Sequence, residues 1–109
     1  MEWLQDMERA IGSIEEFAKA KTEKHFIVDK SLNNSILFQF SVIGEAIKHV
    51  EKEILDKYKY PWHKVRAFRN LIAHEYYNVK LDAVWKIIRN DVPELKRVIR
   101  TILKNEFPS

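Results

Sequence analysis

Apolar residues recur at three- and four-residue intervals along most of the chain, which is the spacing of a helix that buries one face. The first such pattern runs from Trp3 to Phe17 and predicts a helix of about five turns. Thr22 then suits the N-cap of a short helix around Phe26, and residues 29–34 look like a connection. Only two glycines and three prolines interrupt the 109 residues, which favours helices throughout.

The longest predicted helix begins at Ser31 or Ser35 and ends near Tyr58. Its main apolar stripe consists of Ile36, Phe40, Ile43, Ile47, Val50 and Ile54. A second, shorter stripe consists of Phe38, Val42 and Ala46. A helix that is apolar on two sides lies in the middle of a core or also faces a partner. Gly44, in its middle, costs up to about 1 kcal/mol relative to alanine, so either another helix approaches closely there or the glycine is simply tolerated.

The segment from Pro61 to Tyr77 is predicted to form one helix, with Pro61 at the first position, where its missing N–H costs nothing. On a wheel of about 100° per residue, one face carries the apolar side chains Val65, Phe68, Leu71 and Ile72. An arc of about 140° on the other side carries His63, Arg66, Arg69, Asn70, His74 and Tyr77. This helix therefore docks through one face and presents a cationic face that includes imidazoles.

The remaining pattern predicts two more helices. One covers residues 81–90, and the other begins at Asp91, which forms a capping-box-like start with Glu94 and has Pro93 in its first turn. The last helix continues until Phe107. The predicted fold is thus an all-α bundle of about five or six helices, in a single domain over residues 1–109.

Composition narrows the class of protein. Hydrophobic residues make up 46% and charged residues 32%, which suits a soluble folded protein, and the absence of cysteine excludes disulfides and thiolate metal sites. No apolar run approaches about 20 residues and no basic segment opens the chain, so we expect a cytoplasmic protein without a membrane span or signal peptide. The net charge of +3 permits nucleic-acid binding without arguing for it. We interpret His25 and His49 as lacking a carboxylate or imidazole at metal-ligand spacing, and therefore expect no metal and no other cofactor.

Arg69, Asn70 and His74 provide the candidate chemistry of the cationic face. Arginine is always charged and holds phosphate with a fixed fork of donors, and histidine exchanges a proton near neutral pH. Asparagine can hold a hydroxyl or orient the imidazole. These parts are sufficient for RNA cleavage without a metal, in which histidine deprotonates a ribose 2′-hydroxyl and arginine stabilises the charge that develops on the phosphate.

Each of these side chains also has a purely structural interpretation. His74 could hydrogen-bond in a groove between helices, and Arg69 could pair with Glu75 or with an acid on another helix. For His63 and Arg66 the structural interpretation, an exposed helix surface, is the better one.

The segment from Arg69 to Tyr76, Arg-Asn-Leu-Ile-Ala-His-Glu-Tyr, resembles the R-x4-H-x-Y signature of the HEPN superfamily, in particular its HepT branch. The flanks agree with that branch in Ile43-Gly44-Glu45-Ala46, Pro61-Trp62, Leu81-Asp82, Trp85, Asp91, Pro93 and Leu95-Lys96. The resemblance covers nearly the whole chain. The flanks and the order of helices carry most of it, because an arginine and a histidine at this spacing are common.

The resemblance implies a small helical toxin that cleaves RNA, with Arg69 and His74 as catalytic residues and Asn70 in support. It implies a twofold homodimer whose motif helices frame a shared groove, and an MNT-type nucleotidyltransferase antitoxin as partner. It further implies that this partner transfers AMP from ATP to Tyr76. Tyr77 stays open as the acceptor, because it lies on the cationic side of an ideal wheel.

Two points bear on these expectations. The second apolar stripe supports a dimer independently, since a monomer would have to expose it or bury it among few helices. The alternative function is a non-catalytic subunit whose cationic face holds a nucleotide or substrate for a nucleotidyltransferase. Catalysis is favoured because His74 supplies proton transfer, which binding alone does not need.

Overall fold

The computed structural model describes residues 2–70 and 80–108, and every regular element in these ranges is helical, which confirms the all-α prediction. The α-helices are α1 (Glu2–Ala18), α2 (Glu23–Val28), α3 (Lys30–Ile47), α4 (Lys52–Leu55), α5 (Trp62–Ala67), α7 (Leu81–Lys86) and α8 (Val92–Glu106). A π-helical turn, η1 (Ile87–Asp91), joins α7 to α8.

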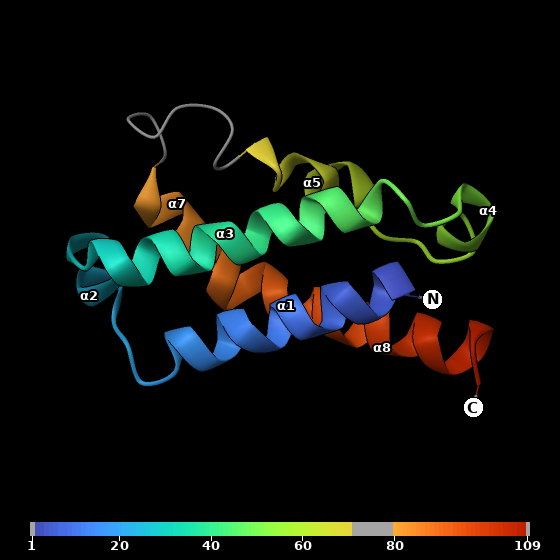
Figure 1. Ribbon diagram of the computed structural model, residues 1–109, viewed down its shortest axis with the longest axis horizontal. Helices are drawn as coiled ribbons and strands as arrows, with labels where there is room; N and C mark the ends of the chain where they lie inside the picture. The colour runs from blue at the N-terminus through green and yellow to red at the C-terminus, as the bar shows by residue number, and fades with distance from the viewer. Residues whose placement is uncertain (1, 71–79, 109) are drawn as a thin grey trace.

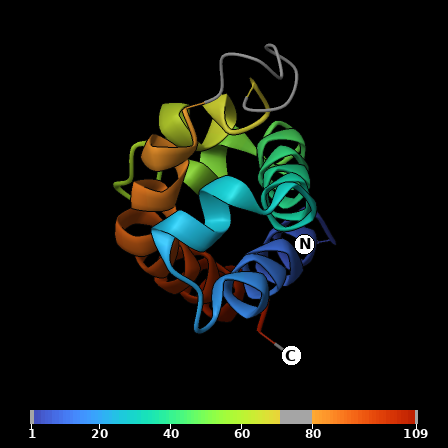
Figure 2. The same cartoon turned by 90° about the vertical axis from the view of Figure 1, so that its left-hand side faces the viewer.

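Helix α3 lies between α1 and α5 (Figure 1). It runs antiparallel to α1 along one side and carries α5 along the other, while α8 packs against α1 (Figure 1). The view along the long axis shows α1, α3, α5, α7 and α8 arranged around a common interior (Figure 2). The most deeply buried large side chains are Phe26, Phe40, Leu4, Met7, Ile11, Ile14, Ile36, Ile43, Ile47, Leu55, Leu95 and Ile99. The main apolar stripe predicted for α3 faces this core, and its members up to Ile47 are all buried.

The start of α3 lies earlier than the sequence pattern predicts. The Thr22 hydroxyl accepts the His25 N–H at 3.1 Å, which confirms the predicted N-cap of α2. Asp29, however, caps α3 at once, because its carboxylate accepts the Leu32 N–H at 3.0 Å. The same backbone donor is the largest cause of the lowered pKa of Asp29. The prediction of a connection over residues 29–34 is therefore wrong. Its polar Asn33 is buried within α3 and donates to the carbonyl of Phe26 at 3.1 Å.

The end of α3 was also predicted wrongly, since the helix stops at Ile47 instead of continuing to Tyr58. Tertiary hydrogen bonds offset the interruption. The indole Nε1–H of Trp62 reaches the carbonyls of Leu55 and Tyr58, each at 3.1 Å, and so satisfies acceptors that a continued helix would have bonded to its own backbone. The α4 turn is thereby fixed to the start of α5.

A carboxylate of α8 holds the segment just before α5. Glu106 accepts the Tyr58 hydroxyl at 2.8 Å and lies 3.0 Å from the Lys57 ammonium group. The Tyr58 hydrogen bond, followed by that of Lys57, holds the pKa of Glu106 below its ordinary value. The linker therefore packs against the end of α8 before the chain turns into α5.

The second stripe of α3 does not form one exposed face. Phe38 is 58% exposed and Val42 is partly buried, but Ala46 is only 2% exposed. Side chains four residues apart on a helix differ in direction by about 40°, so the stripe turns from solvent towards the core. Only Phe38 of the three is available to a partner, and the stripe's independent support for a dimer is correspondingly reduced.

The junction between the last two helices is continuous instead of capped. Asp91 is helical and makes no side-chain cap, so the predicted capping box is wrong. Pro93 has no N–H to donate and its ring would crowd the carbonyl of Arg89 in a regular α-helix. The π-turn η1 widens the helix just ahead of this proline and lets the chain pass into α8 without a break.

Gly44 of α3 is the point at which the motif segment rests on the core. A Cβ atom added to Gly44 would lie 2.8 Å from the Cβ and 2.9 Å from the Cα of Arg69, and closer still to the Arg69 backbone nitrogen. Real Cβ atoms essentially never come so close to a neighbour. Of the two interpretations of Gly44, close approach of another segment is the one that the structure supports.

We expect Gly44→Ala to displace Arg69 and to destabilise the protein, and the chain offers a matched control in Gly12. Overpacking against backbone costs about 1–3 kcal/mol. The higher helix propensity of alanine offsets up to about 1 kcal/mol of this cost. Gly12 lies in α1 with nothing within 4 Å of an added Cβ, so Gly12→Ala should raise the unfolding free energy by about 0.5–1 kcal/mol. Denaturant unfolding of both variants checks this. Equal stabilisation by the two alanines would contradict the close contact at Gly44.

Candidate functional site

The described part of the motif segment lies on α5 and the residues that follow it. Helix α5 docks through Val65, and Phe68 just beyond it is also buried and packs edge-to-face on Phe40 of α3, with ring centroids 4.9 Å apart. The other side of this segment is solvent-exposed, and its side chains are His63, Arg66, Arg69 and Asn70. The predicted division into a docking face and a cationic face is confirmed for these residues. The exposed-surface interpretation of His63 and Arg66 is confirmed with it.

The prediction of one uninterrupted helix over residues 61–77 is wrong. Regular α-helix begins at Trp62, one residue after Pro61, and ends at Ala67. The Phe68 N–H bonds the Val65 carbonyl at 3.1 Å, the three-residue spacing of a tightened last turn. The interruption falls beside Arg69, where the backbone rests on Gly44. A helical wheel drawn across this point no longer predicts how later side chains are directed.

Glu45 of α3 is the immediate neighbour of the Arg69 side chain. Its Oε2 atom lies 3.5 Å from Arg69 Nε. The same carboxylate lies 3.6 Å from Lys48 Nζ and 3.8 Å from His49 Nε2. Arg69 and Glu45 are about half exposed, at 52% and 50%. Such a half-exposed pair adds little to stability, so its main consequence is to orient the guanidinium.

Sequence reasoning did not assign Glu45 a role. It allowed Arg69 to pair with an acid on another helix, and Glu45 is that acid. The Gly44-Glu45 pair belongs to the flanks that resemble the HepT branch, and this was the signal that could have pointed to Glu45. Two adjacent residues of α3 thus meet Arg69, one at its backbone and one at its side chain.

His74, the other predicted catalytic residue, and the two candidate acceptors Tyr76 and Tyr77 lie outside the described residues. The structure therefore places Arg69 and Asn70 on the exposed side of the motif segment and leaves the roles of the three others as predictions.

The interpretation of the histidine spacings needs a correction. His25 and His49 each have a carboxylate four residues away, and the side chains meet at 3.3 Å for His25 with Asp29 and 3.8 Å for His49 with Glu45. Each contact has one histidine and one carboxylate. Within residues 2–70 and 80–108, no three His, Asp or Glu side chains gather closely enough to hold a metal ion.

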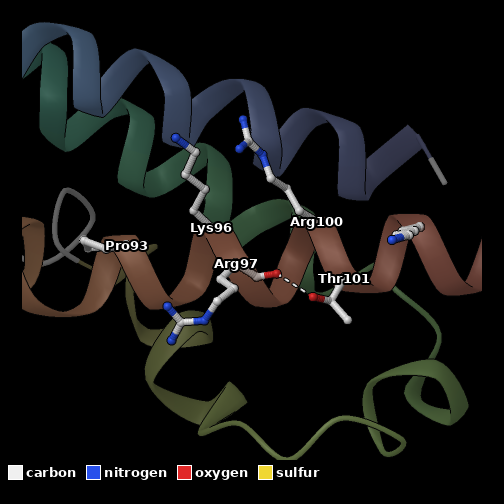
Figure 3. Close-up of a pocket in the computed structure, with 6 residues that line it drawn as sticks. Pro93, Lys96, Arg97, Arg100 and Thr101 are labelled. Atoms are coloured by element: carbon white, nitrogen blue, oxygen red, sulfur yellow. Dashed lines mark hydrogen bonds between the residues drawn. The ribbon is translucent and has the colours of Figure 1, made fainter.

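A basic surface pocket lies on α8, lined by Pro93, Lys96, Arg97, Arg100, Thr101 and Lys104. Figure 3 shows Lys96 and Arg100 directed toward α1, and Arg97 directed the other way. Acidic partners lie close to these three cations: Lys96 is 2.8 Å from Glu15, Arg100 is 3.3 Å from Glu8, and Arg97 is 3.5 Å from Glu94. The positive charge of this pocket is largely neutralised, and none of its lining residues belongs to the motif segment, so we do not regard it as the functional site.

None of the helices in the described part of the chain is long and apolar enough to cross a membrane.

Comparison with known proteins adds independent evidence. The sequence model of the family described as "Ribonuclease HepT-like" matches residues 7–102. No solved structure gives a significant match. The family match thus covers both α3 with Gly44 and Glu45 and the segment with Arg69.

Three curated relatives illustrate the similarity. A "Gamma-glutamylcyclotransferase and putative RNase" of Methanocaldococcus jannaschii is 33% identical over 94% of this chain, which spans only 46% of that relative's length. A "Putative RNase" of Caldanaerobacter subterraneus subsp. tengcongensis is 32% identical, over 84% of this chain and 82% of the relative. A "Probable ribonuclease HepT" of Thermococcus cleftensis is 29% identical, over 87% of each chain. With the family model matching nearly the whole sequence, the chain belongs to the HepT-like ribonuclease family.

Proposed function

We propose that this protein is an endoribonuclease that cleaves RNA without a metal ion, using Arg69 and His74. The observation that carries the proposal is the placement of Arg69. Its backbone rests on Gly44, its side chain is paired with Glu45 through Nε, and the guanidinium is half exposed. The relatives named as RNases favour cleavage over the alternative of a non-catalytic nucleotide-binding subunit.

The proposed reaction is an internal transfer at phosphorus. The His74 imidazole takes the proton of a ribose 2′-hydroxyl, and that oxygen forms a bond to the adjacent phosphorus. The bond from phosphorus to the 5′-oxygen of the next nucleotide breaks, and this oxygen takes up a proton from water as it leaves, while His74 later returns its proton to solvent. The products are a 2′,3′-cyclic phosphate and a free 5′-hydroxyl.

Arg69 would stabilise the negative charge on the phosphate oxygens during this transfer. Among the residues that the structure describes, Glu45 contacts Arg69 through Nε, and we propose that the two terminal nitrogens bind the phosphate, because two parallel donors suit its geometry. Asn70, exposed beside Arg69, would hold a substrate hydroxyl or orient the imidazole.

The biological setting that we propose is a toxin–antitoxin pair. An MNT-type nucleotidyltransferase would neutralise the nuclease by adenylylating Tyr76: the phenolic oxygen attacks the α-phosphorus of ATP and pyrophosphate leaves. The added phosphodiester anion would compete for the Arg69 guanidinium, and the base would fill the substrate groove. A twofold homodimer would bring two motif segments together around that groove.

Arg69→Ala and His74→Ala should each reduce RNA cleavage by at least about 100-fold, because each removes a group that acts on the reacting phosphodiester. Initial rates on a fluorescent RNA measure this, with circular dichroism as the check on folding. Arg66→Ala, at an exposed position of α5, is the matched control and should retain activity.

Cleavage should also persist in excess EDTA. Loss of activity with EDTA and its return with a divalent ion would contradict the metal-independent mechanism.

Glu45→Gln should lower kcat by about 10- to 100-fold, because a misdirected guanidinium stabilises the transition state poorly. The unfolding free energy should change by less than about 1 kcal/mol, since the ion pair is half exposed. Steady-state kinetics and denaturant unfolding together separate the two effects. Glu53→Gln, at an exposed glutamate of α4, is the control and should change neither quantity. Faster cleavage by Glu45→Gln would show that Glu45 restrains Arg69 instead of positioning it.

Tyr76→Phe should retain nuclease activity but escape neutralisation, because the hydroxyl accepts AMP and takes no part in proton transfer from the ribose. Tyr77→Phe should remain sensitive to the partner. Mass spectrometry after incubation with the nucleotidyltransferase, ATP and magnesium should detect AMP on Tyr76. AMP on Tyr77 would reassign the acceptor, and inhibition of an unmodified protein would rule out covalent control.

A further inference from the structure

Trp3 exposes a large aromatic ring close to the candidate site. It is 40% exposed, whereas the two other tryptophans of the chain, Trp62 and Trp85, are only 8% and 7% exposed. By contrast, the adjacent Leu4 and Met7, one turn later on α1, are almost completely buried. The Trp3 ring therefore keeps a substantial solvent-exposed surface, unlike the other two tryptophans.

The Trp3 ring contacts a residue just beyond the end of α3. It stacks on the His49 imidazole, with centroids 4.2 Å apart and planes inclined by 20°. This contact is made where the N-terminal end of α1 lies beside the C-terminal end of α3, as Figure 1 shows. The Trp3 ring of α1 and the His49 ring just after α3 thus form one flat aromatic platform.

Successive side-chain contacts connect this platform to Arg69. His49 Nε2 lies 3.8 Å from Glu45 Oε1, and Glu45 Oε2 lies 3.5 Å from Arg69 Nε. Lys48, 3.6 Å from the same carboxylate, adds a second positive charge between the platform and the guanidinium. An exposed aromatic surface and cations that suit phosphate therefore share one continuous surface.

This combination fits single-stranded RNA. Proteins that bind unpaired strands combine cations along the backbone with aromatic side chains on which bases stack. The surroundings of Trp3 are charged and polar, whereas charged residues are depleted at the centre of protein–protein interfaces. The occupant that the platform favours is thus an unpaired nucleobase.

We propose that Trp3 and His49 form a base-stacking subsite for the RNA strand whose phosphate is bound at Arg69. The proposal rests on the ribonuclease function above and extends it to substrate binding. Stacking on a ring is tolerant of sequence, because every base presents a π-face. The subsite would therefore select unpaired over paired RNA without reading a particular base.

Binding without cleavage tests the subsite directly, using the full-length His74→Ala variant. Acrylamide quenching of tryptophan fluorescence reports mainly on Trp3, since Trp62 and Trp85 are buried. Oligouridylate should protect Trp3 from the quencher. Inorganic polyphosphate offers phosphate charge without bases, so it should compete for binding and leave the quenching unchanged.

Substitutions in the same background give a second measurement. Trp3→Ala should weaken oligouridylate affinity by about 5- to 100-fold, the loss of one stacked base, while Trp3→Phe should retain most of the affinity. Phe17→Ala is the matched control, because Phe17 lies on the same helix and is 38% exposed. It should leave the affinity unchanged.

Three outcomes would overturn the subsite. RNA binding with unchanged Trp3 quenching would place the base elsewhere and leave the ribonuclease function intact. Protection that rises with protein concentration alone, in the absence of RNA, would show that a second copy of the chain covers Trp3. Failure of the His74→Ala variant to bind any RNA would overturn the subsite and the proposed function together.

Discussion

The close contact between Gly44 and the Arg69 backbone is the constraint on which the candidate site depends. A glycine within a helix costs up to about 1 kcal/mol relative to alanine, and this one is the place where the motif segment meets α3. Glu45 follows it directly, and successive residues on a helix are turned by about 100°. Gly44 therefore leaves room for the backbone of Arg69, and Glu45 pairs with the Arg69 side chain.

The electrostatics around Glu45 suit a site in which Arg69 binds a phosphate while it stays paired with Glu45. Arg69 and Lys48 bring two positive charges to one carboxylate, so this group of side chains keeps a net positive charge that attracts phosphate. Because the Arg69–Glu45 pair is half exposed, it is weak enough for a phosphate to share the guanidinium. A deeply buried pair would hold Arg69 more firmly, but a phosphate could reach its guanidinium only at a large desolvation cost.

Much of the fold could be predicted from apolar periodicity, because burial of one helix face is a local property of the sequence. The span of α1, the N-cap at Thr22 and the buried side of α3 all follow from it. The helix ends did not follow from it. The stop at Ile47 is accompanied by side-chain hydrogen bonds from the Trp62 indole to the carbonyls of Leu55 and Tyr58, which apolar spacing does not indicate. The π-turn accommodates Pro93 without the expected cap.

The candidate site shows the same division between local and distant information. The exposed face with His63, Arg66 and Arg69 could be predicted, since it needs only the pattern of one segment. The pairing of Arg69 with Glu45 could not, because it joins side chains on separate helices and many acids of the sequence were equally eligible. The platform of Trp3 and His49 was missed for that reason too. Trp3 fits the apolar pattern of α1, and only the structure shows its ring exposed against a histidine.

The spacing of the motif sets a geometric problem that a regular helix does not solve. His74 lies five positions after Arg69, which on an ideal helix turns the two side chains about 140° apart. The proposed mechanism needs both at one phosphodiester. Two arrangements meet this need: a departure from regular helix within the motif, or an arginine and a histidine contributed by different copies of a twofold dimer. The break in α-helix after Ala67 precedes both side chains, so the first arrangement would need a departure between Arg69 and His74 themselves. The second requires an exposed motif face, and the exposed Arg69 and Asn70 satisfy that condition.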